Sequence, residues 1–189
     1  MFQVIDNFLP KLYQDEIEGV MTLNNFPWYY LPNITTGKPK INDERIKYSH
    51  GFTHQFYHQE EGIQSAFYGF VQTLLHFVPE KYNVQGYYRL KANLTVPDPN
   101  WTKDTFHEPH VDMPIPHLVL LYYVNDSDGD TYFFDQMFDE RAEPEEFTVY
   151  KRVAPKKGTA VIFDGLRYHG SNCPIDHSNR LIINAGIII

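Results

Sequence analysis

The sequence predicts a mainly β protein whose jelly-roll or sandwich core is flanked by two helices. From about Tyr82 onward, the apolar runs are short, rich in β-branched and aromatic residues, and separated by turn residues. Before that point, two segments, 10–23 and 60–78, repeat apolar residues with helical periodicity. A succession of short strands is typical of a jelly roll or sandwich, whose two sheets can enclose a site.

The two helical segments differ in the width of their apolar face. Segment 10–23 has apolar residues near one side of a helix and acids early in its length, whereas segment 60–78 has a wide apolar face that stops at Pro79. We expect both helices to cover one sheet. Between them, residues 32–45 combine proline and glycine with polar residues, a composition that predicts a loop and a candidate flap.

The strands expected in the second part of the chain are 84–96, 106–112, 117–125, 131–135, 147–153, 159–163, 167–172 and 180–189. Aromatic and histidine residues at positions 52, 54, 56 and 58 also alternate as in a strand. We expect one domain over residues 1–189, with a helical N-terminal elaboration at 1–80 and the β core at 81–189.

Composition excludes several classes of protein. The 189 residues include 16 Lys and Arg and 24 Asp and Glu, a net charge of −8, which disfavours nucleic acid and anionic membranes as partners. The longest apolar runs, 118–124 and 181–189, are shorter than the roughly 18 residues that a membrane span needs. The single cysteine, Cys173, and the lack of a signal-peptide pattern predict an intracellular, cytoplasmic protein.

The tripeptide His110-Val111-Asp112 is the most informative motif. On a strand, side chains two residues apart project from the same face, so His110 and Asp112 can approach one ion. We expect His169, at a later strand, to be the third ligand. Two imidazoles and one carboxylate leave coordination positions open, as in non-haem Fe(II) oxygenases. A hydrogen-bonded surface pair is the alternative for His110 and Asp112 considered alone.

Arg180 opens the last apolar strand. A guanidinium in such a strand is unfavourable unless it is paired, and its planar fork suits a carboxylate. The sequence therefore predicts an anionic ligand near Arg180.

These four positions, in this order, resemble the 2-oxoglutarate and Fe(II)-dependent oxygenases, especially the prolyl-hydroxylase-like branch. The runs 120–125 and 155–163 resemble the strand after the metal strand and the run into the distal histidine, and residues 26–30 are similar to small microbial and phage-encoded members. The resemblance covers about residues 84–189. It implies a double-stranded β-helix, a cupin-like jelly roll backed by the two helices.

The resemblance also implies an activity. Such an enzyme uses Fe(II), 2-oxoglutarate and molecular oxygen, with ascorbate as a candidate reductant, and hydroxylates an unactivated C–H bond with release of succinate and carbon dioxide. The branch favours an amino-acid side chain, such as proline in a peptide or protein, although small-molecule substrates share the fold. The sequence leaves the substrate and the oligomeric state open.

Further site residues follow from the same resemblance. Arg180 is implied to hold the C5 carboxylate of 2-oxoglutarate together with Tyr123, and a register slip of one residue would give that place to Tyr122. Asn184 shares the face of Arg180 and could order water or cosubstrate. Many relatives have serine where this chain has Ile182. Candidate substrate contacts are Arg167, Asn93 and Trp101.

Two alternative functions remain. A cupin-like metalloenzyme that does not use an oxoacid would have no need of Arg180. A noncatalytic jelly-roll binding module would form no succinate with iron, ascorbate and 2-oxoglutarate.

Overall fold

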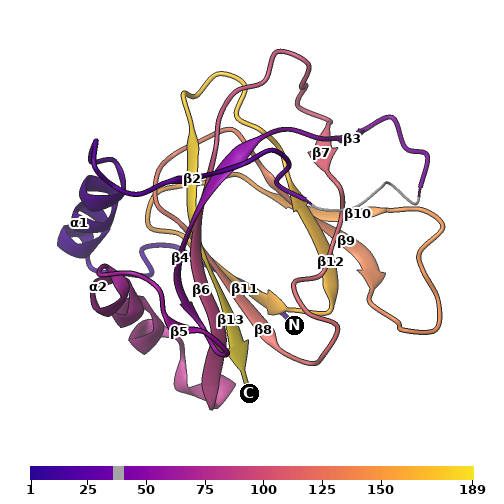
Figure 1. Ribbon diagram of the computed structural model, residues 1–189. Coiled ribbons are helices and arrows are strands. Elements are labelled where there is room, and N and C mark those ends of the chain that lie inside the picture. Colours follow the sequence, from indigo (N-terminus) through magenta and orange to yellow (C-terminus); the bar gives the residue numbers. More distant parts are fainter. Residues whose placement is uncertain (36–40) are drawn as a thin grey trace.

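A large sheet with helices against one face and a smaller sheet facing the other forms the fold (Figure 1). The computed structural model describes residues 1–35 and 41–189. In spatial order, the large sheet contains β1 (Phe2–Ile5), β11 (Ala160–Asp164), β8 (Leu118–Tyr123), β13 (Arg180–Ile188), β6 (Gly86–Thr95), β4 (Gly51–His58) and β2 (Tyr29–Leu31), with β5 (Gly62–Ile63) paired to β4.

The smaller sheet contains β10 (Val149–Val153), β9 (Thr131–Met137) and β12 (Arg167–Ser171), in that order. A short parallel pair, β3 (Ile46–Lys47) and β7 (Phe106–His107), forms a separate two-stranded sheet. The prediction of a mainly β core with two facing sheets is confirmed, and the strands from 117 onward lie within a few residues of their expected bounds.

The first expected helix is confirmed as α1 (Lys11–Met21), but the second is much shorter than expected. The segment 60–78 holds strand β5, then α2 (Tyr68–Gln72) and the 3₁₀ helix η1 (Thr73–Phe77), followed by η2 (Glu80–Tyr82). Gly62 has φ +77°, which turns the chain back into a hairpin with β4. Ser65 then accepts a hydrogen bond from the backbone N–H of Phe67 at 3.0 Å, so helical structure begins only after this turn.

The N-terminal part of the chain is not only helical. It supplies β1, β2 and β4 to the large sheet, and β4 confirms the alternation seen at positions 52–58. Of the expected flap at 32–45, residues 36–40 lie outside the described part of the chain.

The expected strand 106–112 is also interrupted. Regular pairing ends with β7 at His107, and Pro109, which has no backbone N–H, follows two residues later. Pairing resumes as an isolated bridge in which the backbone N–H groups of His110 and His169 donate to each other's carbonyl oxygens at 2.9 and 3.0 Å. Asp112 therefore lies beyond the bridge, in a bend rather than a strand.

Alternation along the large sheet separates two apolar cores. In β8, Leu120 and Tyr122 pack with the helices, whereas Leu121 and Tyr123 pack towards Phe133 of the small sheet. Because successive side chains point to opposite faces, polar residues on the inner face lie between the two sheets.

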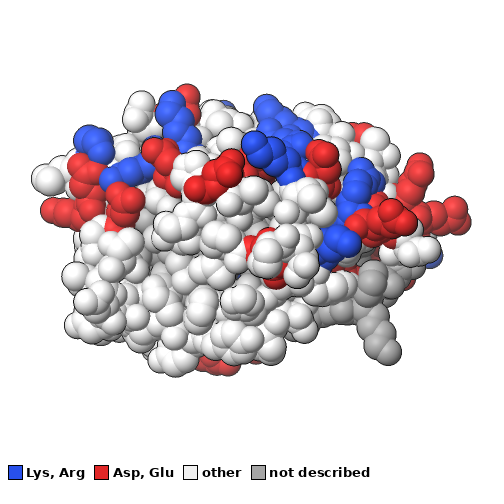
Figure 2. Space-filling model, turned by 90° about the horizontal axis from the view of Figure 1, so that it is seen from above, with Lys and Arg blue, Asp and Glu red and all other residues white. Residues whose placement is uncertain are grey.

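On the face seen in Figure 2, acidic and basic side chains are interspersed along one margin, and much of the remaining surface is uncharged. Among the described residues, none of the helices combines the length and apolar character that crossing a membrane requires.

Candidate metal centre

The structure brings His110, Asp112 and His169 together. One possible ligand atom from each residue lies within 4.8 Å of the other two. His110 and Asp112 follow β7, and His169 lies in β12 of the small sheet. The backbone bridge between His110 and His169 fixes the separation of the two imidazoles, whose ring centroids are 4.7 Å apart.

Local backbone contacts set the orientation of both imidazoles. Nδ1 of His110 donates to the carbonyl oxygen of Glu108, and Nδ1 of His169 donates to that of Arg167, each at 3.1 Å. A carbonyl oxygen can only accept, so each Nδ1 carries the proton and each Nε2 keeps a free lone pair. Nε2 of His169 lies 4.0 Å from Oδ2 of Asp112, a separation that two ligands of one ion can have.

Burial sets the charge of the ligands. It lowers the pKa of His169 to about 4 and also lowers the pKa of His110, so both imidazoles are neutral near pH 7. Burial acts to raise the pKa of Asp112, but the cation of Arg89, the histidines where they are protonated at low pH, and the cation of Lys91 outweigh it and hold this pKa well below its usual range. Two neutral imidazoles and one carboxylate are a donor set that fits a divalent first-row metal.

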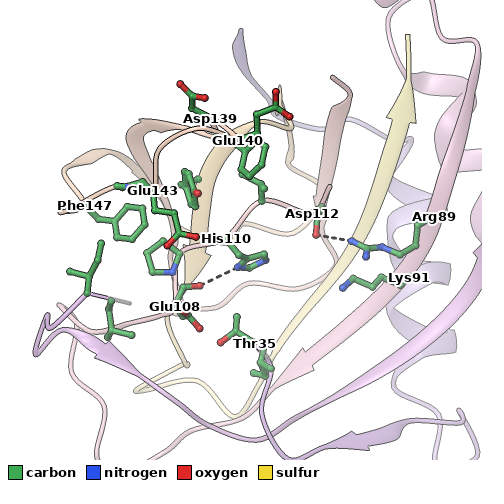
Figure 3. A pocket seen from close by; sticks show the side chains of 18 residues that line it. Thr35, Arg89, Lys91, Glu108, His110, Asp112, Asp139, Glu140, Glu143 and Phe147 are labelled. Atoms are coloured by element: carbon green, nitrogen blue, oxygen red, sulfur yellow. Dashed lines mark hydrogen bonds and ion pairs between the residues drawn. The ribbon is translucent and has the colours of Figure 1, made fainter. Parts of the chain in front are cut away.

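Asp112 is held through both oxygens. Arg89 Nη2 donates to Oδ1 at 2.7 Å, as Figure 3 shows, and Asn184 Nδ2 donates to Oδ2 at 3.2 Å. The sequence predicted Asn184 at the site but did not predict Arg89. The alternation in β6 could have indicated Arg89, because Arg89 and Lys91 occupy one face of this strand and Leu90 and Ala92 occupy the other.

A small inner cavity of about 80 Å³ extends from the metal centre between the two sheets. Its polar lining includes Lys91, Asn93, Thr95, Thr131, Arg180 and Asn184. Thr95 Oγ1, Arg180 Nε and Asn184 Oδ1 are buried and have no hydrogen-bond partner within the part of the chain that is described. Buried polar atoms are normally paired, so these atoms fit a polar ligand.

Arg180 lies at the far end of this cavity and is only 2% exposed. Its Nη2 donates to Thr131 Oγ1 at 2.8 Å, and the Tyr123 hydroxyl donates to the same oxygen at 2.8 Å. The guanidinium lies 5.9 Å from the centre of the Tyr123 ring. Burial raises the pKa of Tyr123 to about 12, so its hydroxyl stays protonated.

The register of β8 separates the two candidate tyrosines. Tyr123 lies on the side of Arg180, whereas Tyr122 packs in the core beneath the helices. A cosubstrate contact by Tyr123 stays a prediction, because its hydroxyl already donates to Thr131.

A larger cavity of about 690 Å³ opens on the other side of the metal centre (Figure 3). His110 and Asp112 line both cavities, as does Lys91. The outer wall includes Glu108, Phe138, Asp139, Glu140, Pro144, Phe147 and Tyr168.

The three candidate substrate residues lie in different places. Asn93 lines the inner cavity, where its Oδ1 accepts a hydrogen bond from Thr53. Trp101 instead packs on His107, with ring centroids 4.3 Å apart, and Arg167 donates to the carbonyl oxygen of Phe134. Neither side chain is among the residues that line these two cavities, and a substrate contact by either stays a prediction.

Comparison with known proteins identifies the fold. No family model matches the sequence, and no curated protein matches it. The solved structures that resemble the chain include an oxidoreductase of the 2OG-Fe(II) oxygenase family from Burkholderia pseudomallei, at 12% identity and a TM-score of 0.66, over 98% of this chain and 84% of that one.

Two prolyl hydroxylases are also similar. One, from Trichoplax adhaerens and solved with a hypoxia inducible factor peptide fragment, has 16% identity and a TM-score of 0.59 over 99% of this chain and 83% of that one. A prolyl-4-hydroxylase from Pseudomonas putida has 14% identity and a TM-score of 0.54 over 100% and 92%. This chain therefore has the jelly-roll fold of the 2-oxoglutarate and Fe(II)-dependent oxygenases, as the sequence predicts.

Proposed function

We propose that this protein is a 2-oxoglutarate and Fe(II)-dependent dioxygenase that hydroxylates an unactivated C–H bond. The observation that carries the proposal is the position of His110, Asp112 and His169 at the end of a cavity that contains buried Arg180. The shared fold supports the same activity.

In this proposal, the three ligands hold Fe(II) through two Nε2 atoms and one carboxylate oxygen, and they leave the remaining coordination positions open. Bound Fe(II), with 2-oxoglutarate and oxygen, supplies the oxidising chemistry that yields succinate, carbon dioxide and a hydroxylated product. Arg180 pairs with the carboxylate of 2-oxoglutarate that is remote from the metal. Thr131 and Tyr123 keep its guanidinium oriented.

The donors on Asp112 have a separate task. Arg89 and Asn184 each bind one of its oxygens, which keeps the carboxylate ionised and fixes its rotation. The inner cavity between the two sheets takes the cosubstrate, while the larger cavity admits the molecule to be hydroxylated.

We further propose that the substrate is an amino-acid side chain, such as proline in a peptide or protein. Two observations support this. The outer cavity, at about 690 Å³, is large enough for a peptide segment or a drug-sized molecule. Two proteins of the same fold are prolyl hydroxylases, one of them solved with a peptide. The net charge of −8 disfavours nucleic acid.

The most informative experiment needs no knowledge of the substrate. Fe(II) and then 2-oxoglutarate are added without oxygen, and the visible spectrum and the melting temperature are followed. We expect a weak charge-transfer band and a higher melting temperature, and then succinate once oxygen and ascorbate are supplied.

Two other outcomes would contradict the proposal and favour the alternatives. If iron binds but 2-oxoglutarate changes neither the spectrum nor the melting temperature, the protein is a metalloenzyme without an oxoacid cosubstrate. If neither binds, a noncatalytic module is the better description.

A further inference from the structure

Lys91 is the one basic side chain of the two cavities whose role the proposed function leaves unassigned. It lies in the middle of β6 and lines both the outer and the inner cavity. Figure 3 shows its side chain reaching into the cavity beside Arg89. It has neither a hydrogen bond nor an ion pair with any described residue, so its ammonium group is available to a ligand.

The neighbouring charges explain why Lys91 is not paired within the protein. The carboxylate of Asp112 is already bonded to Arg89 and Asn184. Asp112 is also the only acidic residue in the lining of the inner cavity, within the described ranges, whereas Lys91 and Arg180 both line it. Before any metal is bound, this cavity thus has an excess of positive charge, and a divalent metal would increase that excess. A ligand with two negative charges is the natural complement.

The strand register places the two cations at opposite ends of this cavity. In the pairing of β6 with β13, Lys91 lies opposite Asn184 and Thr95 lies opposite Arg180. Four residues of strand span about 13 Å. Arg180 therefore marks the end remote from the metal, and Lys91 marks the end next to Asp112.

Burial makes an unpaired ammonium unfavourable at this position. Burial and then the cation of Arg89 lower the pKa of Lys91 to about 8, and the carboxylate of Asp112 only partly opposes them. An added carboxylate would stabilise the charged form.

We propose that Lys91 binds the C1 carboxylate of 2-oxoglutarate, so that Lys91 and Arg180 each hold one end of the cosubstrate. This inference rests on the proposed function. The inference goes beyond that function because it assigns a second basic contact to 2-oxoglutarate, at the carboxylate that is released as carbon dioxide. When the C1 carboxylate leaves as carbon dioxide, the C2 carbonyl carbon becomes the second carboxylate of succinate. This carboxylate is one carbon closer to the end that Arg180 holds, so Lys91 distinguishes the cosubstrate from its product by how far the second carboxylate reaches.

The test compares binding of 2-oxoglutarate and succinate to the full chain loaded with Co(II), measured by calorimetry. We expect K91M to raise the Kd of 2-oxoglutarate at least 10-fold and that of succinate less than 3-fold, whereas R180M weakens both. K91R keeps the charge and should stay within 3-fold of the wild type for both ligands. The matched control is K103M, which removes an exposed lysine on the surface.

The affinity for Co(II) is an independent readout. Removing a cation near the metal should leave the Kd for Co(II) unchanged or lower it, whereas a merely structural role for Lys91 would raise it. Where K91M does not fold, K91Q replaces it in the same comparison with K91R.

A Kd of 2-oxoglutarate in K91M within 3-fold of the wild type would overturn the inference. So would equal weakening of 2-oxoglutarate and succinate. Failure of the proposed function is a different result, in which the wild-type protein binds Co(II) but no 2-oxoglutarate.

Discussion

Arg89 Nη2 lies 2.7 Å from Asp112 Oδ1, so a guanidinium neutralises the carboxylate ligand of the candidate metal centre. The side chains are 18% and 5% exposed, and this pair is therefore largely desolvated. Removing one partner of such a pair leaves an uncompensated charge in the interior. The ion pair thus stabilises the metal-free protein, and a bound metal could replace part of this stabilisation.

We expect R89M to lower the free energy of unfolding of the metal-free protein by about 3 kcal/mol, because Asp112 loses its counter-charge. With saturating Co(II), the loss should fall to about 1 kcal/mol, since the ion supplies positive charge to the same carboxylate. Urea unfolding with EDTA and with Co(II) measures both values. K11M, which breaks the exposed pair of Lys11 with Asp15, should change stability by less than about 1 kcal/mol in either condition. An equal loss for R89M with and without metal would contradict this account.

The second prediction concerns the ligands. Replacing His110, Asp112 or His169 by alanine removes one of three donors, and we expect the affinity for Fe(II) or Co(II) to fall at least roughly 100-fold. Anaerobic metal titration measures it. The control is H177A, which removes an exposed imidazole that pairs with Asp128. Affinity within 3-fold of the wild type in any one ligand variant would exclude that residue from the metal centre.

The third prediction concerns Arg180. R180M should weaken 2-oxoglutarate by about 2–5 kcal/mol, the usual range for breaking a desolvated charge pair, while Co(II) affinity stays close to the wild type. Calorimetry with the Co(II)-loaded protein gives both quantities. Unchanged cosubstrate affinity would remove Arg180 from the site and favour a metalloenzyme that does not use an oxoacid.

The two neighbouring tyrosines give a fourth prediction. Y123F removes a hydrogen bond to Thr131, which also holds Arg180, so we expect a loss of about 1 kcal/mol in stability and a severalfold weaker Kd for 2-oxoglutarate. The buried hydroxyl of Tyr122 has no partner among the described residues. Y122F should therefore leave the Kd unchanged and keep or raise stability. The reverse pattern would show that Tyr122 faces the cosubstrate.

Much of the β core could be predicted because its strands are short runs bounded by turn residues, and the ligand trio could be predicted from its spacing. The second helix could not, because the periodicity of segment 60–78 contains no sign of the hairpin that Gly62 forms with β4. Ile63 belonged to the expected apolar face, yet in β5 it is 64% exposed. Tertiary pairing here overrides local propensity.

The pairing of Arg89 with Asp112 lay beyond sequence reasoning for a related reason. The two residues lie on separate segments, and only the folded sheet shows that the inner face of β6 meets the bend after His110. Alternation alone places Arg89 and Lys91 on one face of a strand but does not identify their partners. Trp101 and Arg167 are not among the residues that line the two cavities, so a substrate contact by either stays a prediction.

The last prediction concerns pH and uses His107, which is buried but lies outside the ligand trio. Burial lowers the pKa of His107 to about 3. Nδ1 of this histidine donates to the carbonyl oxygen of Ser171, and Nε2 accepts a hydrogen bond from the Ser49 hydroxyl. The unfolded chain binds a proton at this histidine below about pH 6.5, whereas the folded chain does not until about pH 3. The stability from a neutral His107 is therefore fully present above pH 6.5 and is lost as the pH falls towards 3. Between pH 7.5 and 5.0, this one group should lower the free energy of unfolding by about 2 kcal/mol.

We expect H107Q to be less stable than the wild type at pH 7.5, because glutamine cannot reproduce both hydrogen bonds, but to lose about 2 kcal/mol less on going to pH 5.0. Urea unfolding with EDTA at the two pH values measures the difference, and the change with pH is the readout rather than stability itself. H177Q, which replaces a histidine at an exposed position, is the control. If H107Q loses as much stability between the two pH values as the wild type does, His107 is not held neutral by burial, and the acid sensitivity arises elsewhere.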